Sequence, residues 1–120
     1  MADRILFLSW GAPVRGREER GLEVFNEALG MLGRKQQDGQ IESFDVCLLA
    51  PNASVNGYVQ IRGMAEQINA LREDPEFQRS TLDASLIVEN LQHIVGYCNE
   101  GIAAQMALYQ EAIGKVPQLH

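Results

Sequence analysis

The feature that most constrains this chain is the order in which its hydrophobic patterns change period. Residues 5–10 (ILFLSW) form an apolar run typical of a buried strand, and residues 17–37 follow a helical period. Strand-like segments follow at 41–49 and 57–62, then a helix at about 75–90 and a strand at 91–98. This order predicts an α+β fold in which an antiparallel sheet of four strands carries both helices on one face.

The third strand-like segment assigns the two faces of that sheet. Val59 and Ile61 alternate with Tyr58, Gln60 and Arg62, and the aliphatic pair is expected to face the helices. The other three side chains then lie on the open face, which the helices of the chain leave uncovered. Because an open sheet face with apolar residues needs a cover, we expect a homodimer formed over this face.

Two more helices are predicted. Residues 64–71 favour a short helix, and Asp74 followed by Pro75 is a start signal for the helix that comes next. After residue 101 the pattern predicts an extra C-terminal helix, which must dock on its own subunit or across a dimer. Its apolar positions are Ile102, Met106, Tyr109 and Ile113.

The composition is that of one globular domain over residues 1–120. A net charge of −6 argues against nucleic acid, which needs a concentrated basic face, and against an anionic membrane surface. The sequence has neither a signal-peptide pattern nor an apolar run long enough to span a membrane. We therefore expect a cytoplasmic protein.

Cys47 and Cys98 are the only cysteines. With the first and third strands in the middle of the sheet, the two residues lie on opposite edge strands, about 14 Å apart. That separation is too large for a disulfide. We expect two free, semi-buried thiols in a reducing compartment, with no neighbouring base to make either one a nucleophile.

The pattern over residues 4–98, together with the segment LREDPEFQR at 71–79, resembles the dimeric α+β barrel superfamily of ferredoxin-like proteins. The resemblance implies a βαββαβ fold and two sheets packed face to face around a cleft. Members include cofactor-independent monooxygenases, small isomerases, haem-degrading enzymes and ligand-sensing modules. The catalytic motifs of the monooxygenase branch are absent, so the resemblance implies a fold and no particular chemistry.

His93 is the only histidine inside a predicted element, while His120 is the last residue and is expected to be frayed. A neutral imidazole that faces the cleft can act as a general base or a metal ligand. The favoured alternative is an edge-strand histidine that makes one hydrogen bond. No cluster with metal-ligand spacing accompanies it, so neither a metal nor another cofactor is expected.

A set of aromatic and polar side chains is expected to share the open face and to contact a ligand. Its members are Trp10, Tyr58, Gln60, Arg62 and Tyr97. Apolar walls with sparse polar groups build small-molecule pockets and also dimer interfaces, and an interface alone is favoured here. Arg62 can bind an anionic ligand, but an ion pair with Asp45 or Glu42 on the neighbouring strand is the simpler expectation.

A second place for an anion is the loop before the first helix. Arg15, Arg17 and Arg20 lie near a predicted helix N-terminus, where backbone N–H groups favour negative charge. Glu18 and Glu19 dilute this positive charge. A solvated loop is therefore favoured over an anion site.

Two functional hypotheses remain open. The first is a homodimer that binds a small hydrophobic or anionic molecule in a cleft over the open face. The second is a small cofactor-independent enzyme, monooxygenase- or isomerase-like, that acts on a hydrophobic or aromatic metabolite. In the enzyme, His93 would be the base and Arg62 and Gln60 would orient the substrate. Binding is favoured because the sequence supplies apolar walls more readily than acids and bases.

Overall fold

The computed structural model describes residues 1–119, so His120 and the prediction made for it lie outside the described residues. The strands are β1 (Arg4–Trp10), β2 (Ser43–Leu48), β3 (Gly57–Gly63) and β4 (Gln92–Tyr97). The helices are α1 (Glu18–Gln37), α2 (Ala65–Glu73), α3 (Pro75–Ser85) and α4 (Glu100–Gly114). The predicted α+β fold with an extra C-terminal helix is confirmed.

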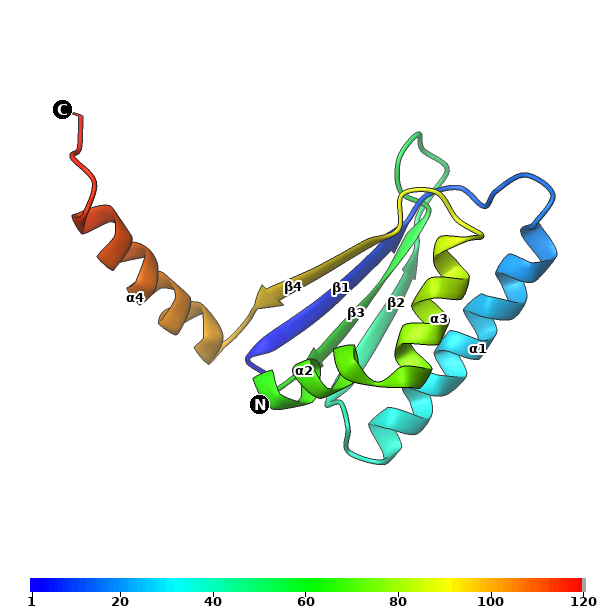
Figure 1. Cartoon of the computed structure of the whole chain (residues 1–120), viewed down its shortest axis with the longest axis horizontal. Helices are drawn as coiled ribbons and strands as arrows, with labels where there is room; N and C mark the ends of the chain where they lie inside the picture. Colours follow the sequence, from blue (N-terminus) through cyan, green and yellow to red (C-terminus); the bar gives the residue numbers. More distant parts are fainter. Residues whose placement is uncertain (120) are drawn as a thin grey trace.

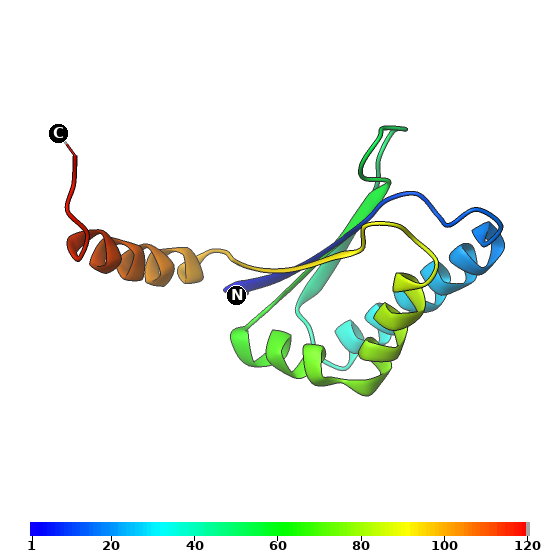
Figure 2. The ribbon, with the colours of Figure 1, turned by 45° about the horizontal axis from the view of Figure 1, so that its top comes forward.

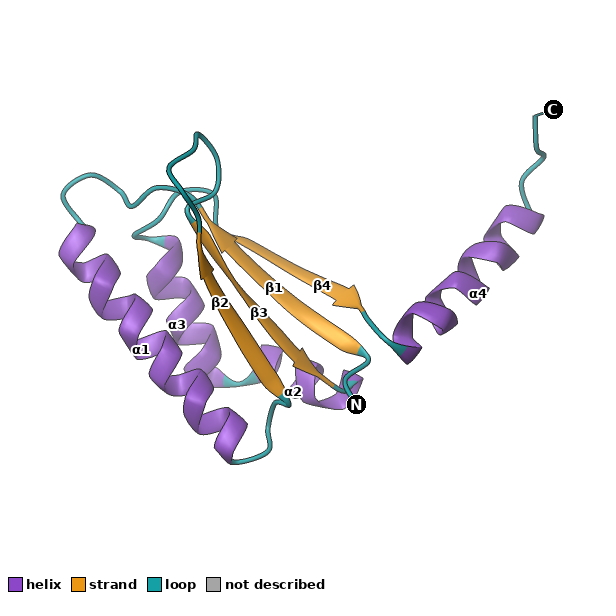
Figure 3. Ribbon diagram, turned by 180° about the vertical axis from the view of Figure 1, so that it is seen from behind, coloured by secondary structure: helices purple, strands orange, loops and turns teal. Residues whose placement is uncertain are grey.

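The strands form one antiparallel sheet in the order β2-β3-β1-β4. Figure 1 shows α1, α2 and α3 gathered on one side of this sheet, while α4 extends away from it beyond the end of β4. Figure 3 shows the four strands from behind, where no helix lies over them. Within the described residues, no helix has both the length and the apolar character needed to cross a membrane.

The core lies between the sheet and the helices. Leu6 of β1 lies directly opposite Ile61 of β3, and neither side chain is exposed to solvent. Leu32 of α1 and Phe77 of α3 belong to the same buried cluster and cover the sheet from the helix side. Val59 is also buried, so the predicted helix-facing side of β3 is confirmed.

The start of α3 follows the predicted signal. Asp74 is the N-cap residue, and its carboxylate accepts a hydrogen bond of 2.9 Å from the backbone N–H of Phe77. Pro75 occupies the first helical position. The buried ammonium group of Lys35, from α1, lies 3.1 Å from the same carboxylate. One side chain thus caps α3 and ties it to α1.

The end of α3 was predicted too late. The helix stops at Ser85, and the following residues bond to the loop after β1 instead of continuing the helix. The backbone N–H of Val14 donates to the carbonyl of Ile87 at 2.6 Å, and that of Gly11 donates to Glu89 at 2.7 Å. These long-range hydrogen bonds replace those that a longer helix would make.

The buried side of α1 does not include all of its apolar residues. Leu22 shares a three- and four-residue spacing with Phe25, Leu29 and Leu32, but its side chain is 67% exposed. The buried residues are Val24, Met31, Leu32 and Lys35, so the inner face is rotated away from Leu22. Because α1 carries apolar residues on more than one side, its period alone does not fix which side meets the sheet.

Candidate functional site

The register of the sheet decides which of the predicted site residues share a face. Gln60 lies opposite Phe7 on one neighbouring strand and opposite Asp45 on the other. Residues directly opposite one another point to the same side of a sheet. Tyr58, Gln60 and Arg62 therefore share the open face with Phe7, as predicted.

Trp10, His93 and Tyr97 lie on the other face, so the prediction that Trp10 and Tyr97 line the open face was wrong. Trp10 is paired with Gly57, which alternates with the open-face residue Tyr58, and its indole packs on α1. His93 is paired with Leu8 of the helix-covered side. The sequence shows that residues 7 and 10 of one strand point to opposite faces, but it does not say which of the two faces the helices.

His93 is separated from the polar groups with which it was expected to act. Its ring lies on Phe77 of α3, with centroids 5.6 Å apart, at the edge of the helix-covered face. Partial burial and the positive charge of Arg72 lower the pKa of His93, although the side chain remains exposed on its outer side. Gln60 and Arg62 lie on the far side of the sheet. The structure therefore gives His93 no part in an open-face cleft.

Tyr97 is also engaged on the helix-covered side. It is paired with Arg4 across the strands, and the Arg4 guanidinium lies 4.7 Å from the centre of its ring. This is the geometry of a cation–π contact. The arrangement explains the position of Tyr97 without a ligand.

The open face combines an aromatic centre with an ion pair at its β2 side. The rings of Phe7 and Tyr58 are 5.2 Å apart, and Arg62 forms the predicted ion pair with Asp45. The neighbouring Cys47 side chain raises the pKa of the Tyr58 hydroxyl. The centre of the open face is therefore aromatic, and the guanidinium group of Arg62 beside it is already paired with a carboxylate.

Cys47 and Cys98 are both free, as predicted, but Cys47 is exposed on the open face rather than semi-buried. Its strand, β2, and β4, which precedes Cys98, are the two edges of the sheet. Among residues 1–119, no three His, Cys, Asp or Glu side chains gather in a way that would hold a metal ion.

In the loop before α1 and the first turn of the helix, where the sequence allows for an anion, charged side chains bind groups of the protein itself. The Arg20 guanidinium lies 3.0 Å from the Glu23 carboxylate and 3.4 Å from that of Glu27. Glu18 accepts a hydrogen bond of 2.8 Å from the backbone N–H of Gly16. The solvated, internally paired loop is the arrangement that the structure shows.

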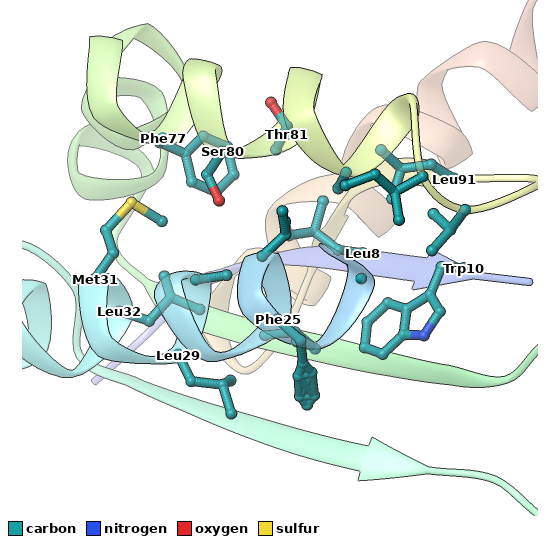
Figure 4. Close-up of a pocket in the computed structure, with 17 residues that line it drawn as sticks. Leu8, Trp10, Phe25, Leu29, Met31, Leu32, Phe77, Ser80, Thr81 and Leu91 are labelled. Atoms are coloured by element: carbon teal, nitrogen blue, oxygen red, sulfur yellow. The ribbon is translucent and has the colours of Figure 1, made fainter. Parts of the chain in front are cut away.

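An apolar cavity of about 120 Å³ lies on the helix-covered side, between α1, α3 and the sheet. Figure 4 shows Leu8 and Trp10 of β1, Phe25 and Leu29 of α1, and Phe77 of α3 around it. The rings of Trp10 and Phe25 meet edge to face, with centroids 5.8 Å apart. The sequence pattern predicts a cleft over the open face, whereas this cavity lies on the opposite face.

Small residues on the two helices open this cavity. Gly21 and Ala28 line it from α1, and Ser80 and Ala84 line it from α3. Two helices that carried large side chains at these positions would interdigitate and fill the space, as protein interiors normally do. The cavity therefore follows from the residue sizes at the α1–α3 contact.

The cavity wall contains few polar groups. Ser80 and Thr81 contribute hydroxyls, and that of Thr81 donates to the carbonyl of Gln78 at 2.9 Å within α3. Figure 4 shows the Ser80 hydroxyl on the side of α3 that faces α1, and that of Thr81 turned away. Neither a carboxylate, a histidine nor a basic side chain lines the cavity. Such a wall suits a neutral, largely apolar molecule.

No protein-family model matches the sequence, and no curated protein matches it. Several solved structures are similar in fold, among them the following three. One is a dimeric protein of unknown function and ferredoxin-like fold from Bacteroides fragilis NCTC 9343. It is 12% identical, with 79% of this chain and 96% of that chain covered and a TM-score of 0.59.

The other two are described as oxygenases. SnoaB, a cofactor-independent oxygenase from Streptomyces nogalater, is 17% identical over 82% of this chain and 95% of that chain, with a TM-score of 0.53. A protein from Chloroflexus aurantiacus J-10-fl is described as an antibiotic biosynthesis monooxygenase. It is 10% identical, with 80% of this chain and 93% of that chain covered and a TM-score of 0.53. At such identities the similarity shows the fold alone. The chain therefore has a ferredoxin-like fold, as its sequence pattern predicted.

Proposed function

We propose that this protein is a homodimer that binds a small, neutral, largely apolar molecule in the cavity between α1, α3 and the sheet. The cavity is the observation that carries the proposal. Its wall is almost entirely apolar, and it opens to solvent where Trp10, Phe25 and Leu29 remain partly exposed. An enclosed apolar cavity of about 150 Å³ accepts benzene, so the 120 Å³ found here suits a molecule of about one aromatic ring.

The residues that line the cavity limit the class of ligand that it can bind. Trp10 and Phe25 offer ring edges and faces, which favour a planar or aromatic molecule. Ser80 can exchange one hydrogen bond with a ligand hydroxyl or carbonyl. A carboxylate or phosphate group would lie against this wall without a positive partner, at a large cost in free energy. The cavity therefore disfavours the anionic ligand that the sequence left open.

The homodimer is supported by the open face. Phe7 and Tyr58 form an aromatic pair there, and Ile94 of β4, which lies opposite Phe7, is 48% exposed. Aromatic residues beside a paired arginine are typical of a protein interface. The similar protein from Bacteroides fragilis is described as dimeric. The two free cysteines fit a reducing compartment, and we propose the cytoplasm.

A second candidate is a cofactor-independent oxygenase or isomerase that acts on the same class of molecule. It is favoured by the aromatic wall of the cavity and by the oxygenase descriptions of two similar structures. However, the cavity wall has no acid or base, and His93 lies outside it. Binding without chemistry is therefore the primary proposal.

Trp10 is the only tryptophan, so its emission reports on the cavity directly. Titration with toluene should change the Trp10 emission in a saturable way and raise the melting temperature. The variant A84L, which fills the cavity from α3, should lose both responses, while Y58A on the open face should keep them. The proposal is rejected if wild-type protein and A84L respond alike. Oxygen uptake with a small aromatic hydroquinone, abolished in A84L, would favour the enzyme.

A further inference from the structure

The C-terminal helix α4 leaves its apolar side chains uncovered. Every residue from 102 to 114 is exposed, although only its first residue and Glu111 are charged within the helix. The exposed large side chains are Ile102, Met106, Leu108, Tyr109 and Ile113. A helix that is apolar around most of its circumference is normally buried. Docking on its own subunit, one of the two predicted alternatives, is not observed.

The segment at the start of α4, residues 98–101, fixes the direction in which the helix leaves the sheet and the other three helices. The side-chain amide of Asn99 donates to the carbonyl of Ala2 at 2.8 Å, and the backbone N–H of Cys98 donates to Asp3 at 3.2 Å. Gly101 is buried so closely against the carbonyl of Asp3 that a Cβ atom would not fit. Figure 2 shows α4 directed away from the sheet and from α1–α3. The first turn is thus anchored, and the rest of the helix projects.

The projecting helix makes the chain too extended for a compact monomer. Its radius of gyration is 17.0 Å, compared with about 14 Å for a compact chain of this length. Its accessible surface of 8115 Å² exceeds by about 1,700 Å² the roughly 6,400 Å² of a folded monomer of this mass. A stable protein interface buries about 800 Å² per partner. The excess surface is therefore large enough for a stable association.

We propose that α4 is an exchanged arm that packs on a second copy of this chain, each copy giving its arm to the other. A helix of this length extends about 22 Å past the body, far enough to cross a neighbouring protomer. Its Glu111 is paired with Lys115 at 3.6 Å, so the arm offers little unpaired charge to attract a nucleic acid or a charged surface. A second copy offers the exposed Ile94 beside the half-buried Phe7, and reciprocal exchange satisfies two-fold symmetry.

The proposed homodimer supplies the partner for this inference, but the inference is independent of the cavity. The first test uses the full-length double variant M106E/I113E, in which both changes lie on the same face of α4, two turns apart. Sedimentation equilibrium should show a dimer for the wild type and a dissociation constant at least about 100-fold higher for the variant. The matched control L22E/L82E changes one leucine on α1 and one on α3, both of which are more exposed than Met106 and Ile113. This control should dimerise like the wild type.

A second test identifies what α4 touches. A photoreactive p-benzoylphenylalanine at position 109 should cross-link purified protein into a covalent dimer on irradiation, whereas the same residue at position 82 should not. Equal dimer affinity of M106E/I113E and the wild type, a monomeric wild type, or cross-links confined to one chain would each overturn the exchanged arm. Toluene binding by Trp10, measured in the same variants, tells failure of the arm from failure of the ligand site.

Discussion

The indole of Trp10 meets the ring of Phe25 edge to face across the wall of the apolar cavity, with ring centroids 5.8 Å apart. One ring comes from the central strand β1 and the other from α1, so the contact joins the sheet to its longest helix. Edge-to-face pairs contribute about 0.5–1.5 kcal/mol beyond the area that they bury. The position of Trp10 therefore governs both the stability of the α1 contact and the shape of the cavity.

The first prediction concerns the residue opposite Trp10. A Cβ atom at Gly57 would lie 2.7 Å from the carbonyl oxygen of Cys47 and 2.8 Å from Cζ2 of Trp10. The variant G57A should therefore lower the free energy of unfolding by about 1–3 kcal/mol through overpacking. It should also shift the Trp10 emission. Urea unfolding followed by fluorescence measures both effects.

The control for this prediction is Gly33 in α1, where nothing lies within 4 Å of the added atom. The variant G33A should be stabilised by up to about 1 kcal/mol, because alanine favours the helix. Equal stabilities of G57A and the wild type would show that the indole does not occupy the position described.

The second prediction separates the two faces of the sheet. Y58A should weaken dimerisation by about 2 kcal/mol or more, because Tyr58 lies at the aromatic centre of the open face. W10A should leave the dimer constant unchanged within a few-fold, because Trp10 lies on the helix-covered face. Sedimentation equilibrium measures the dimer dissociation constant of each variant and shows which face of the sheet forms the interface. A dimer weakened by W10A and not by Y58A would place the interface on the helix side.

The third prediction concerns the carboxylate that caps α3 and pairs with Lys35. D74A removes the N-cap and the nearest carboxylate of Lys35, whose ammonium group keeps Gln40 at 3.1 Å and Glu76 at 4.0 Å, and should cost about 1–3 kcal/mol of stability. D74N retains an oxygen that can accept from Phe77 but loses the charge, so it should fall between D74A and the wild type. Urea unfolding at neutral pH measures the order of the three proteins.

Asp74 also gives a dependence on pH. The hydrogen bond from Phe77 and the charge of Lys35 lower the pKa of Asp74 in the folded state. Its contribution to stability is therefore present above the unfolded pKa of about 3.9 and is lost as the pH falls through the lower folded pKa. D74N should lack this part of the loss. Parallel acid-dependence curves for the two proteins would contradict the pairing.

The fourth prediction concerns His93. Burial against Phe77 and the charge of Arg72 lower the pKa of this imidazole. Its neutral form is favoured on folding, so stability is retained above the unfolded pKa of about 6.5 and decreases as the pH falls through the folded value. A proton NMR titration should give a His93 pKa below 6.5, and H93Q should flatten the stability curve in this range. A pKa above the unfolded value would contradict the contact with Phe77.

Much of the fold could be read from local patterns. Alternation in β3 gave the correct face to Val59 and Tyr58, and the Asp74-Pro75 pair marked the start of α3. These signals are local, because strand alternation and helix capping depend on residues within a few positions of one another. The order of the elements then led to the sheet order, since this succession of patterns has few ways to pack.

The site was less predictable because it depends on contacts between distant segments. β1 is apolar on both faces, so its pattern did not say whether Trp10 or Phe7 met the helices, and the pairing of Trp10 with Gly57 decided it. β4 alternates weakly, and its register with β1 placed His93 beside Phe77 rather than over the open face.

The identity and order of the elements follow from the sequence, because hydrogen bonding and side-chain alternation within each segment are short-range. The cavity and the exposure of α4 follow only from tertiary contacts, since the cavity arises where small residues of α1 and α3 meet over Trp10. Both depend on how separate elements are placed against one another, and the packing that places them is a property of the whole chain.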